Sequence, residues 1–265
     1  MIYMKKYVSL CIIIISFNIS CFFRSQTIFE KFPQLLVEIK SDLESDRWDI
    51  RLLGLKKLYD TNEYKEFPES KQLILTASFD EQTLVRIEAI HMLTELKTPS
   101  ATNRIMTLAE NDINDNVRWE AIISLGILKE RRAIPLLIEA AKSEDWLIRE
   151  AAYKSINKIA ISSDQEELNH IIVNGILDSV NSVKCAALDN IPFHHPNIYN
   201  AIKSILLQSN ISQTLLIACL NAIPGYALDT TVKELIISYL TNKNPEIRII
   251  DLKALKQDNT YSKKR

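Results

Sequence analysis

The side chains best suited to chemistry are four histidines and four cysteines, and their spacing does not assemble a reaction centre. His194 and His195 are adjacent in a proline-flanked stretch, where two imidazoles could share a metal ion. No Asp, Glu or Cys stands beside them at ligand spacing, so a solvated loop is the favoured interpretation. The sequence contains no phosphate loop, nucleophile elbow or Cys-x-x-Cys motif. We therefore predict no catalytic residue, no cofactor and no metal site.

The side-chain type that does recur at regular spacing is basic, and it belongs to a short phrase that returns seven times. In each copy an aliphatic residue is followed, usually, by a base, and then by a small residue and two more aliphatics. The pairs that open the phrase are Ile50-Arg51, Val85-Arg86, Val117-Arg118, Ile148-Arg149, Val183-Lys184, Leu215-Leu216 and Ile247-Arg248. Their second residues are separated by 35, 32, 31, 35, 32 and 32 positions. A period of this size indicates stacked structural repeats.

The phrase has the spacing of one helix face. With the second residue of each pair as position zero, apolar or small residues fall at positions −1, +3, +4 and +7, which is a helical stripe and not a strand alternation. Position +3 holds Gly54, Ala89, Ala121, Ala152, Ala187, Cys219 and Asp251. Position +4 holds Leu55, Ile90, Ile122, Tyr153, Leu188, Leu220 and Leu252, and position +7 holds Leu58, Leu93, Leu125, Ile156, Ile191, Ile223 and Leu255. The small residue at +3 would allow a neighbouring helix to approach closely, and the large ones would fill the space between layers.

A second amphipathic run precedes each phrase, for example over residues 134–140, 168–177, 198–207 and 232–240. Each repeat therefore reads as a helix A, a short turn and a helix B. Asp115, Asp145 and Asn181 stand just ahead of helix B, where a side-chain oxygen can accept from free backbone N–H groups, and Asn244-Pro245 has the same character. The chain has only four glycines and no Asn-Gly or Asp-Gly hairpin, which weighs against an all-β fold. The predicted fold is an all-α α-solenoid of about seven helix-turn-helix repeats over residues 28–257.

These residues resemble the HEAT-repeat family, especially its short-repeat branch of the phycobilisome-lyase type. The best matches are the stretches 132–152 and 115–126, and the resemblance extends over about residues 28–257. The sixth repeat departs from the pattern with Leu216 at position zero, and the seventh with Asp251 at +3. In this family the Asp before helix B and the base at position zero usually form a ladder of contacts between repeats. The resemblance thus implies a structural ladder of Asp115, Arg118, Asp145 and Arg149.

The N-terminus has a different character. Lys5 and Lys6 precede an apolar run over residues 7–17 that has the length of a secretory signal and is short for a membrane span. The following Asn18-Ile19-Ser20-Cys21 resembles a bacterial lipobox, which implies cleavage before Cys21 and lipid attachment to it; Asn18 departs from the usual Leu. We expect a signal peptide over residues 1–20 and a short tether over 21–27. A plain cleaved signal and an uncleaved anchor remain alternatives.

Two of the cysteines belong to the repeats. Cys185 and Cys219 fall on helix B of neighbouring repeats, at positions +1 and +3. Core thiols are the favoured interpretation, and a disulfide stays open if the compartment is oxidising.

The charge balance excludes one class of partner. The formal net charge is −1, and because residues 1–20 carry two lysines and no acid, the remaining chain carries −3. A mildly acidic surface offers no electrostatic footprint for a phosphate backbone, so we expect no nucleic acid partner. Residues 258–265 form a polar basic tail. The unbroken repeat favours one elongated domain over two compact ones.

Surface recognition is then the expected activity. Helix B of the third repeat carries Trp119, Ile123 and Ile127 at +1, +5 and +9, a stripe that either packs against the neighbouring repeat or binds a partner. In HEAT-like folds helix B lines the concave side, which adds His91 and Lys154, both at +5, to the candidate partner-binding residues. The leading hypothesis is a non-enzymatic protein-binding scaffold or assembly factor of the bacterial cell envelope, held at a membrane by its lipid or signal segment or secreted to the periplasm. The alternative is a lyase-like enzyme that handles a small molecule.

Overall fold

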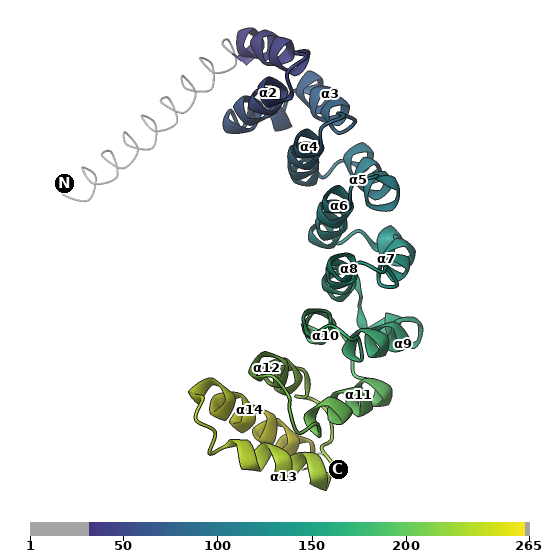
Figure 1. Ribbon diagram of the computed structural model, residues 1–265, viewed down its shortest axis with the longest axis vertical. Coiled ribbons are helices and arrows are strands. Elements are labelled where there is room, and N and C mark those ends of the chain that lie inside the picture. Colours follow the sequence, from purple (N-terminus) through teal and green to yellow (C-terminus); the bar gives the residue numbers. More distant parts are fainter. Residues whose placement is uncertain (1–31, 263–265) are drawn as a thin grey trace, which may run out of the picture. The chain divides into compact units, whose positions relative to one another are not determined.

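The computed structural model describes residues 32–262, and in that part of the chain the backbone forms helices and turns without a β-strand (Figure 1). The predicted signal over residues 1–20, the tether over 21–27 and Cys21 lie outside the described residues. Residues 32–43 form the first described helix. The helices that follow are α2 (Trp48–Asp60), α3 (Pro68–Ala77), α4 (Thr83–Leu96), α5 (Pro99–Asn111), α6 (Asp115–Leu128), α7 (Ile134–Ala140), α8 (Trp146–Ile159), α9 (Gln165–Ile176), α10 (Asn181–Leu188), α11 (Pro196–Leu206), α12 (Gln213–Ala222), α13 (Thr230–Tyr239) and α14 (Pro245–Ser262). Short 3-10 helices are η1 (Glu63–Lys65), η2 (Arg131–Ala133) and η3 (Ser162–Asp164).

The described helices divide into two compact units, one that ends at Leu96 and one that begins at Lys97. In the first unit α4 packs against both α2 and α3. In the second unit α6, α8, α10, α12 and α14 each pack against the next and form a layer of B helices. The A helices α5, α7, α9, α11 and α13 each pack on a B helix and form the second layer. The chain is therefore an all-α α-solenoid of stacked helix pairs, as the repeat period predicts.

The core of the stack is the predicted stripe. At position +3 all seven residues are buried, and so are the first six at +4. At −1 and +7 most are fully buried, with Ile50, Ile191 and Leu255 half-buried. Each such aliphatic contributes roughly 1.5–3 kcal/mol by leaving water. Because one repeat cannot cover its own stripe, this stabilisation depends on the next repeat in the stack.

The small residues of the stripe mark close approaches between helices. Gly126 of α6 lies so near α8 that a Cβ built on it would stand 2.6 Å from Ser155 Oγ and 2.9 Å from Ser155 Cα. A side chain at this position would force the two helices apart.

The last repeat differs from the prediction. Leu252, at +4, is 49% exposed, whereas Ile250 and Ala254 are buried together with Asp251. The buried face of α14 is thus turned relative to that of the other B helices. Both carboxylate oxygens of Asp251 are buried and accept no hydrogen bond within the described part of the chain.

Turn chemistry fixes where the helices begin. Asp145 accepts from the Leu147 N–H and is the N-cap of α8, as predicted. The cap of α6 is Asn114, one residue earlier than expected, and Asp115 lies in the first helical turn. Asn181 is likewise the first residue of α10 rather than its cap. Prolines open α3, α5, α11 and α14, where the missing N–H leaves no backbone bond unmade.

Candidate binding surface and the ladder of turns

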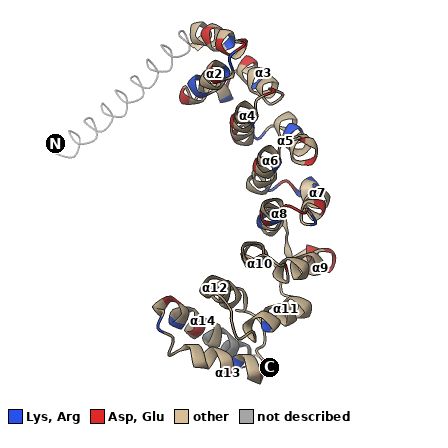
Figure 2. Ribbon diagram, in the orientation of Figure 1, with Lys and Arg blue, Asp and Glu red and all other residues tan. Residues whose placement is uncertain are grey.

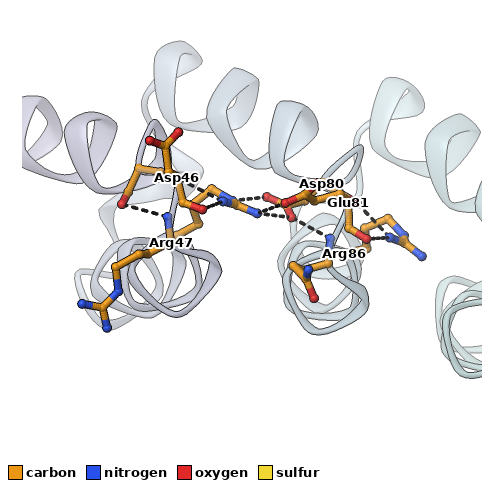
Figure 3. Close-up of polar contacts among 8 residues, drawn as sticks. Asp46, Arg47, Asp80, Glu81 and Arg86 are labelled. Carbon is orange, nitrogen blue, oxygen red and sulfur yellow. Dashed lines mark hydrogen bonds and ion pairs between the residues drawn. The ribbon is translucent and has the colours of Figure 1, made fainter.

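The base at position zero ties together the turn that precedes its own helix. The Arg149 guanidinium donates to the carbonyls of Ser143 (2.8 Å) and Glu144 (2.9 Å), which lie six and five residues earlier. The same pattern of donation to the −6 carbonyl is found for Arg51, Arg86, Arg118 and Arg248. Figure 3 shows it for Arg86 with Asp80 and Glu81. The recurring arginine is therefore a brace of the A-to-B turn, and it fixes the entry of helix B in the five repeats that carry it.

Two of these arginines also reach the next repeat. Arg51 binds the Asp80 carboxylate with two parallel hydrogen bonds of 2.6 and 2.8 Å, and Arg149 binds Asp178 in the same way at 2.8 and 3.0 Å. All four side chains are at most 14% exposed. Burial is the largest single influence and would raise the pKa of Asp80 and Asp178. The hydrogen bonds from the arginine and from a turn N–H, together with the nearby positive charges, outweigh burial and lower the pKa of both carboxyls. These pairs are the rungs of a ladder between repeats.

The ladder uses a different acid from the one that the family resemblance implies. Arg149 does join two repeats, but through Asp178 and not through Asp145, which caps α8. Arg118 pairs with Asp115 inside its own repeat and makes no rung to the α7–α8 turn. The reason is geometric, because an arginine at position zero points back along its helix to the turn edge and meets the −6 residue of the next repeat.

Position −6 is the signal that sequence reasoning missed. It is occupied by short polar residues, whose side chains also accept from the backbone N–H two residues on. They are Ser45, Asp80, Asp112, Ser143, Asp178 and Asn242. Only where this residue is an aspartate can it both hold its turn and accept from the preceding repeat.

The predicted partner-binding residues of α6 lie on one face. Trp119 and Ile123 are half-buried, and Ile127 is 56% exposed. Positions +1 and +5 of the next B helices continue this face within the second unit. On α8 they hold Glu150 and Lys154, which form an ion pair with each other. His91 is exposed at +5 of α4, in the first unit.

A groove of 1130 Å³, open to solvent, lies across α8, α10 and α12 on the same face. Asn181, Ser182, Thr214 and Asn221 line it; the Ser182 hydroxyl is buried without a hydrogen-bond partner among the described residues, and the other three side chains are exposed. Ile191 and Ile217 add apolar surface. Helix α12 carries no Lys, Arg, Asp or Glu and is tan throughout in Figure 2. The groove thus offers uncharged donors and acceptors beside aliphatic surface.

The most reactive side chains of the groove, His194 and Cys185, and the neighbouring His195 and Cys219 are either hydrogen-bonded or protonated. His194 Nε2 lies 3.0 Å from the Pro224 carbonyl, and its ring packs edge-on against Tyr226. His195 Nδ1 accepts from the Asn197 N–H and caps α11. Burial raises the pKa of Cys185, and that of Cys219 to about 12, so both thiols stay protonated near neutral pH.

Among residues 32–262, no three His, Cys, Asp or Glu side chains gather as a metal site would require. No helix in that range has the length and apolar character needed to cross a membrane.

Comparison with known families identifies the repeat. A family model described as HEAT repeats matches residues 70–157 and, in a second register, 102–173. Residues 70–173 of the chain carry HEAT repeats. The match falls on α3 to α9.

Solved structures resemble these HEAT repeats at low identity. The X-ray structure of YibA from Escherichia coli shares 15% identity and a TM-score of 0.55, over 86% of this chain and 96% of that one. The archaeal HEAT-like repeats protein from Thermococcus onnurineus NA1 shares 16% identity and a TM-score of 0.54, over 84% and 97%. The complex of CpcE and CpcF of phycocyanin lyase from Nostoc sp. PCC7120 shares 19% identity over 82% and 85%, with a TM-score of 0.49. A search of curated proteins found no match to the chain. Such likeness shows the HEAT-like fold and nothing about the reaction or partner.

Proposed function

We propose that this HEAT-repeat protein is a non-enzymatic scaffold of the bacterial cell envelope that binds a protein partner on its B-helix face. The observation that carries the proposal is the groove over α8, α10 and α12, which three exposed polar side chains and the unpartnered hydroxyl of Ser182 line. The groove spans three consecutive repeats and runs along the direction in which the repeats stack. This shape suits an elongated ligand. The signal-like residues 1–20 and Cys21 support placement in the envelope.

The lining of the groove favours a polypeptide over other ligands. Neutral amide and hydroxyl groups match the donors and acceptors of a peptide backbone, and the isoleucines suit aliphatic side chains. The lining has no Phe, Tyr or Trp on which a sugar or a base would stack, and its cation Lys154 is paired with Glu150. A lyase-like activity has less support, because the thiol of Cys185 is protonated and the Nε2 of His194 is engaged with a backbone carbonyl.

The apolar end of the same face is part of the proposal. Trp119, Ile123 and Ile127 would extend the contact from the groove onto α6, and the change Ile123→Glu tests this. If the variant keeps its thermal midpoint and loses its partners, the stripe is a contact surface. If the protein melts instead, Ile123 belongs to the core, and the contact ends at α8.

The test of the groove is a comparative capture of the full chain from native membranes. The double variant Asn181→Arg/Asn221→Arg places two bulky cations in the groove at exposed positions. Gln208→Arg/Ser209→Arg is the matched control, because both residues are exposed in the turn between α11 and α12, outside the groove. Quantitative mass spectrometry measures the amount of each protein that is captured. For proteins captured by the wild type and the control, we expect this amount to be at least tenfold lower with the groove variant. Equal recovery in all three would refute the groove, and a co-purifying small molecule lost only in the groove variant would favour the enzyme alternative.

The envelope part of the proposal has its own test. We expect metabolic labelling with a fatty acid to mark the wild type and to disappear in Cys21→Ala. If the wild-type chain is found unlabelled in the cytosolic fraction, the proposed location in the envelope is wrong. The proposed scaffold function would not be affected.

A further inference from the structure

A second exposed surface lies on the turns of the compact unit over residues 97–265, apart from the groove. Ile113 is 94% exposed, Trp146 42%, Leu147 40% and Leu177 53%. All four stand in A-to-B turns or at the first residues of helix B, at positions −7 to −2, outside the buried stripe. We refer to these four residues as the turn-edge patch. Large apolar side chains therefore stand exposed in three consecutive turns.

The three turns are neighbours in the stack. Helices α6 and α8 pack side by side, as do α8 and α10. Arg149, one turn of helix beyond Trp146, binds Asp178, the residue next to Leu177. The patch therefore runs along one edge of three repeats, with successive turns separated by the spacing of packed helices, about 8–10 Å.

The surroundings of the patch are acidic. The turn segments 112–115, 143–147 and 177–181 contain five acids and no Lys or Arg. Arg118 pairs with Asp115 and Arg149 with Asp178, so the acidic character of the edge rests on Glu144 and Asp145. Glu144 is exposed, and neither it nor Asp145 has an ion-pair partner among the described residues. This edge complements a cationic partner and would be repelled by anionic lipid.

Five backbone N–H groups in or next to these turns are already hydrogen-bonded. The N–H groups of Asn114 and Asn116 are bound by turn side chains, and so are those of Asp145, Leu147 and Val180. An extended peptide that binds by backbone pairing needs such groups free. A helical ligand does not, because its backbone bonds are internal. Seven residues of a helix advance about 10.5 Å, which is close to the spacing of the turns.

We propose that the turn-edge patch binds an amphipathic helix of another protein, with apolar residues at seven-residue intervals and Lys or Arg on its flanks. Apolar side chains one heptad apart would contact Ile113, then Trp146 and Leu147, then Leu177. The flanking cations would face Glu144 and Asp145. This surface is separate from the groove, so either proposal can fail without the other.

The test uses the full chain in a mild non-ionic detergent and a labelled synthetic helix of three heptads, with Leu on one face and Lys elsewhere. Fluorescence anisotropy measures the dissociation constant. We expect Ile113→Ser/Leu147→Ser to weaken binding at least tenfold and Ile161→Ser to leave it unchanged. Ile161 is the matched control, because it is 51% exposed and lies in the B-to-A connection after α8. A peptide with Gln in place of Lys should bind at least fivefold more weakly, and added salt should weaken the Lys peptide.

Three results would overturn the proposal. The first is equal affinity of the patch variant and the wild type for the Lys peptide. The second is equal affinity of the Gln and Lys peptides, because the acidic surroundings would then select nothing. The third is co-flotation with phosphatidylcholine vesicles that falls in the patch variant but not in Ile161→Ser, because the edge would then face lipid.

Discussion

The repeat formed by α7 and α8 is joined to its two neighbours in different ways. At the α8–α10 joint, Arg149 and Asp178 form a bidentate rung, and Asn157 donates to the carbonyls of Ala186, Ala187 and Asp189 at the end of α10. At the α6–α8 joint there is no rung, because Ser143 stands where the acid would be. That joint is held instead by the close approach of Gly126 and a buried hydrogen bond of 2.9 Å from Ser155 Oγ to the Ile122 carbonyl.

The comparison distinguishes the contacts that every joint of the stack shares from the contacts that are specific to one joint. The buried stripe is common to both joints and supplies the larger share of the stability. The polar contacts are specific to one joint, so they set which repeat can follow which more than whether repeats stack at all.

The largest effect is expected where the joints are alike. Leu125→Ala on α6 and Ile156→Ala on α8 each remove a fully buried side chain at +7, and each should cost about 2–5 kcal/mol. Denaturant unfolding followed by circular dichroism measures both. If either variant lowers the free energy of unfolding by less than about 1 kcal/mol, the buried stripe does not stabilise the two joints equally.

Next comes the rung. Asp178→Ala leaves the guanidinium of Arg149, 14% exposed, without its acid, and we expect a loss of about 2–3 kcal/mol. Asp115→Ala is the matched control, because Asp115 is exposed and its pair with Arg118 should contribute about 0–1 kcal/mol. If the two variants unfold at the same denaturant concentration, the rung adds nothing to the α8–α10 joint.

Gly126→Ala addresses the other joint. The added methyl meets the backbone of α8 at Ser155, and overpacking of this kind costs about 1–3 kcal/mol. Pairing it with Ser155→Gly removes the side-chain part of the clash and should recover some of the loss. A double variant that is less stable than the sum of its single changes would contradict the close-approach explanation.

Acid should weaken the two joints unequally. Because the folded protein lowers the pKa of Asp178 below its ordinary value of 3.8, the rung's contribution is complete above about pH 4 and is lost as the pH falls through the folded pKa. The difference in unfolding free energy between the wild type and Asp178→Asn should therefore shrink on acidification below pH 4. A constant difference from pH 7 down to pH 3 would mean that the carboxylate is not the group that matters.

The smallest effect is a gain. Ser143→Asp places an acid at the −6 position facing Arg118 and should add a rung to the α6–α8 joint worth up to about 1 kcal/mol. The gain should vanish when Arg118 is changed to Met, as a double-mutant cycle would measure. A gain that survives the loss of Arg118 would come from the turn alone.

The fold was predictable from the sequence because the core stripe repeats at a fixed period, and Leu125 and Ile156 lie where that period puts them. The end of the stack was less predictable, since Leu252 keeps the pattern in the sequence yet is exposed in α14. The rung acid was missed because its partner lies 29 residues away, and only the direction of the arginine side chain selects Asp178 over Asp145. The groove could not be predicted from the pattern of one repeat, because side chains from three helices line it.

Asp251 gives the far end of the stack a response to acid opposite to that of the rung. Burial raises the pKa of this carboxyl to about 6, so the last helix pair is held most firmly when Asp251 is protonated and loosens as the pH rises through that value. Asp178 must instead be ionised to hold its joint. Both conditions are met together only in mildly acidic water, between about pH 4 and 6. At neutral pH the Asp178 rung is complete, whereas the last helix pair lacks the contribution of a protonated Asp251.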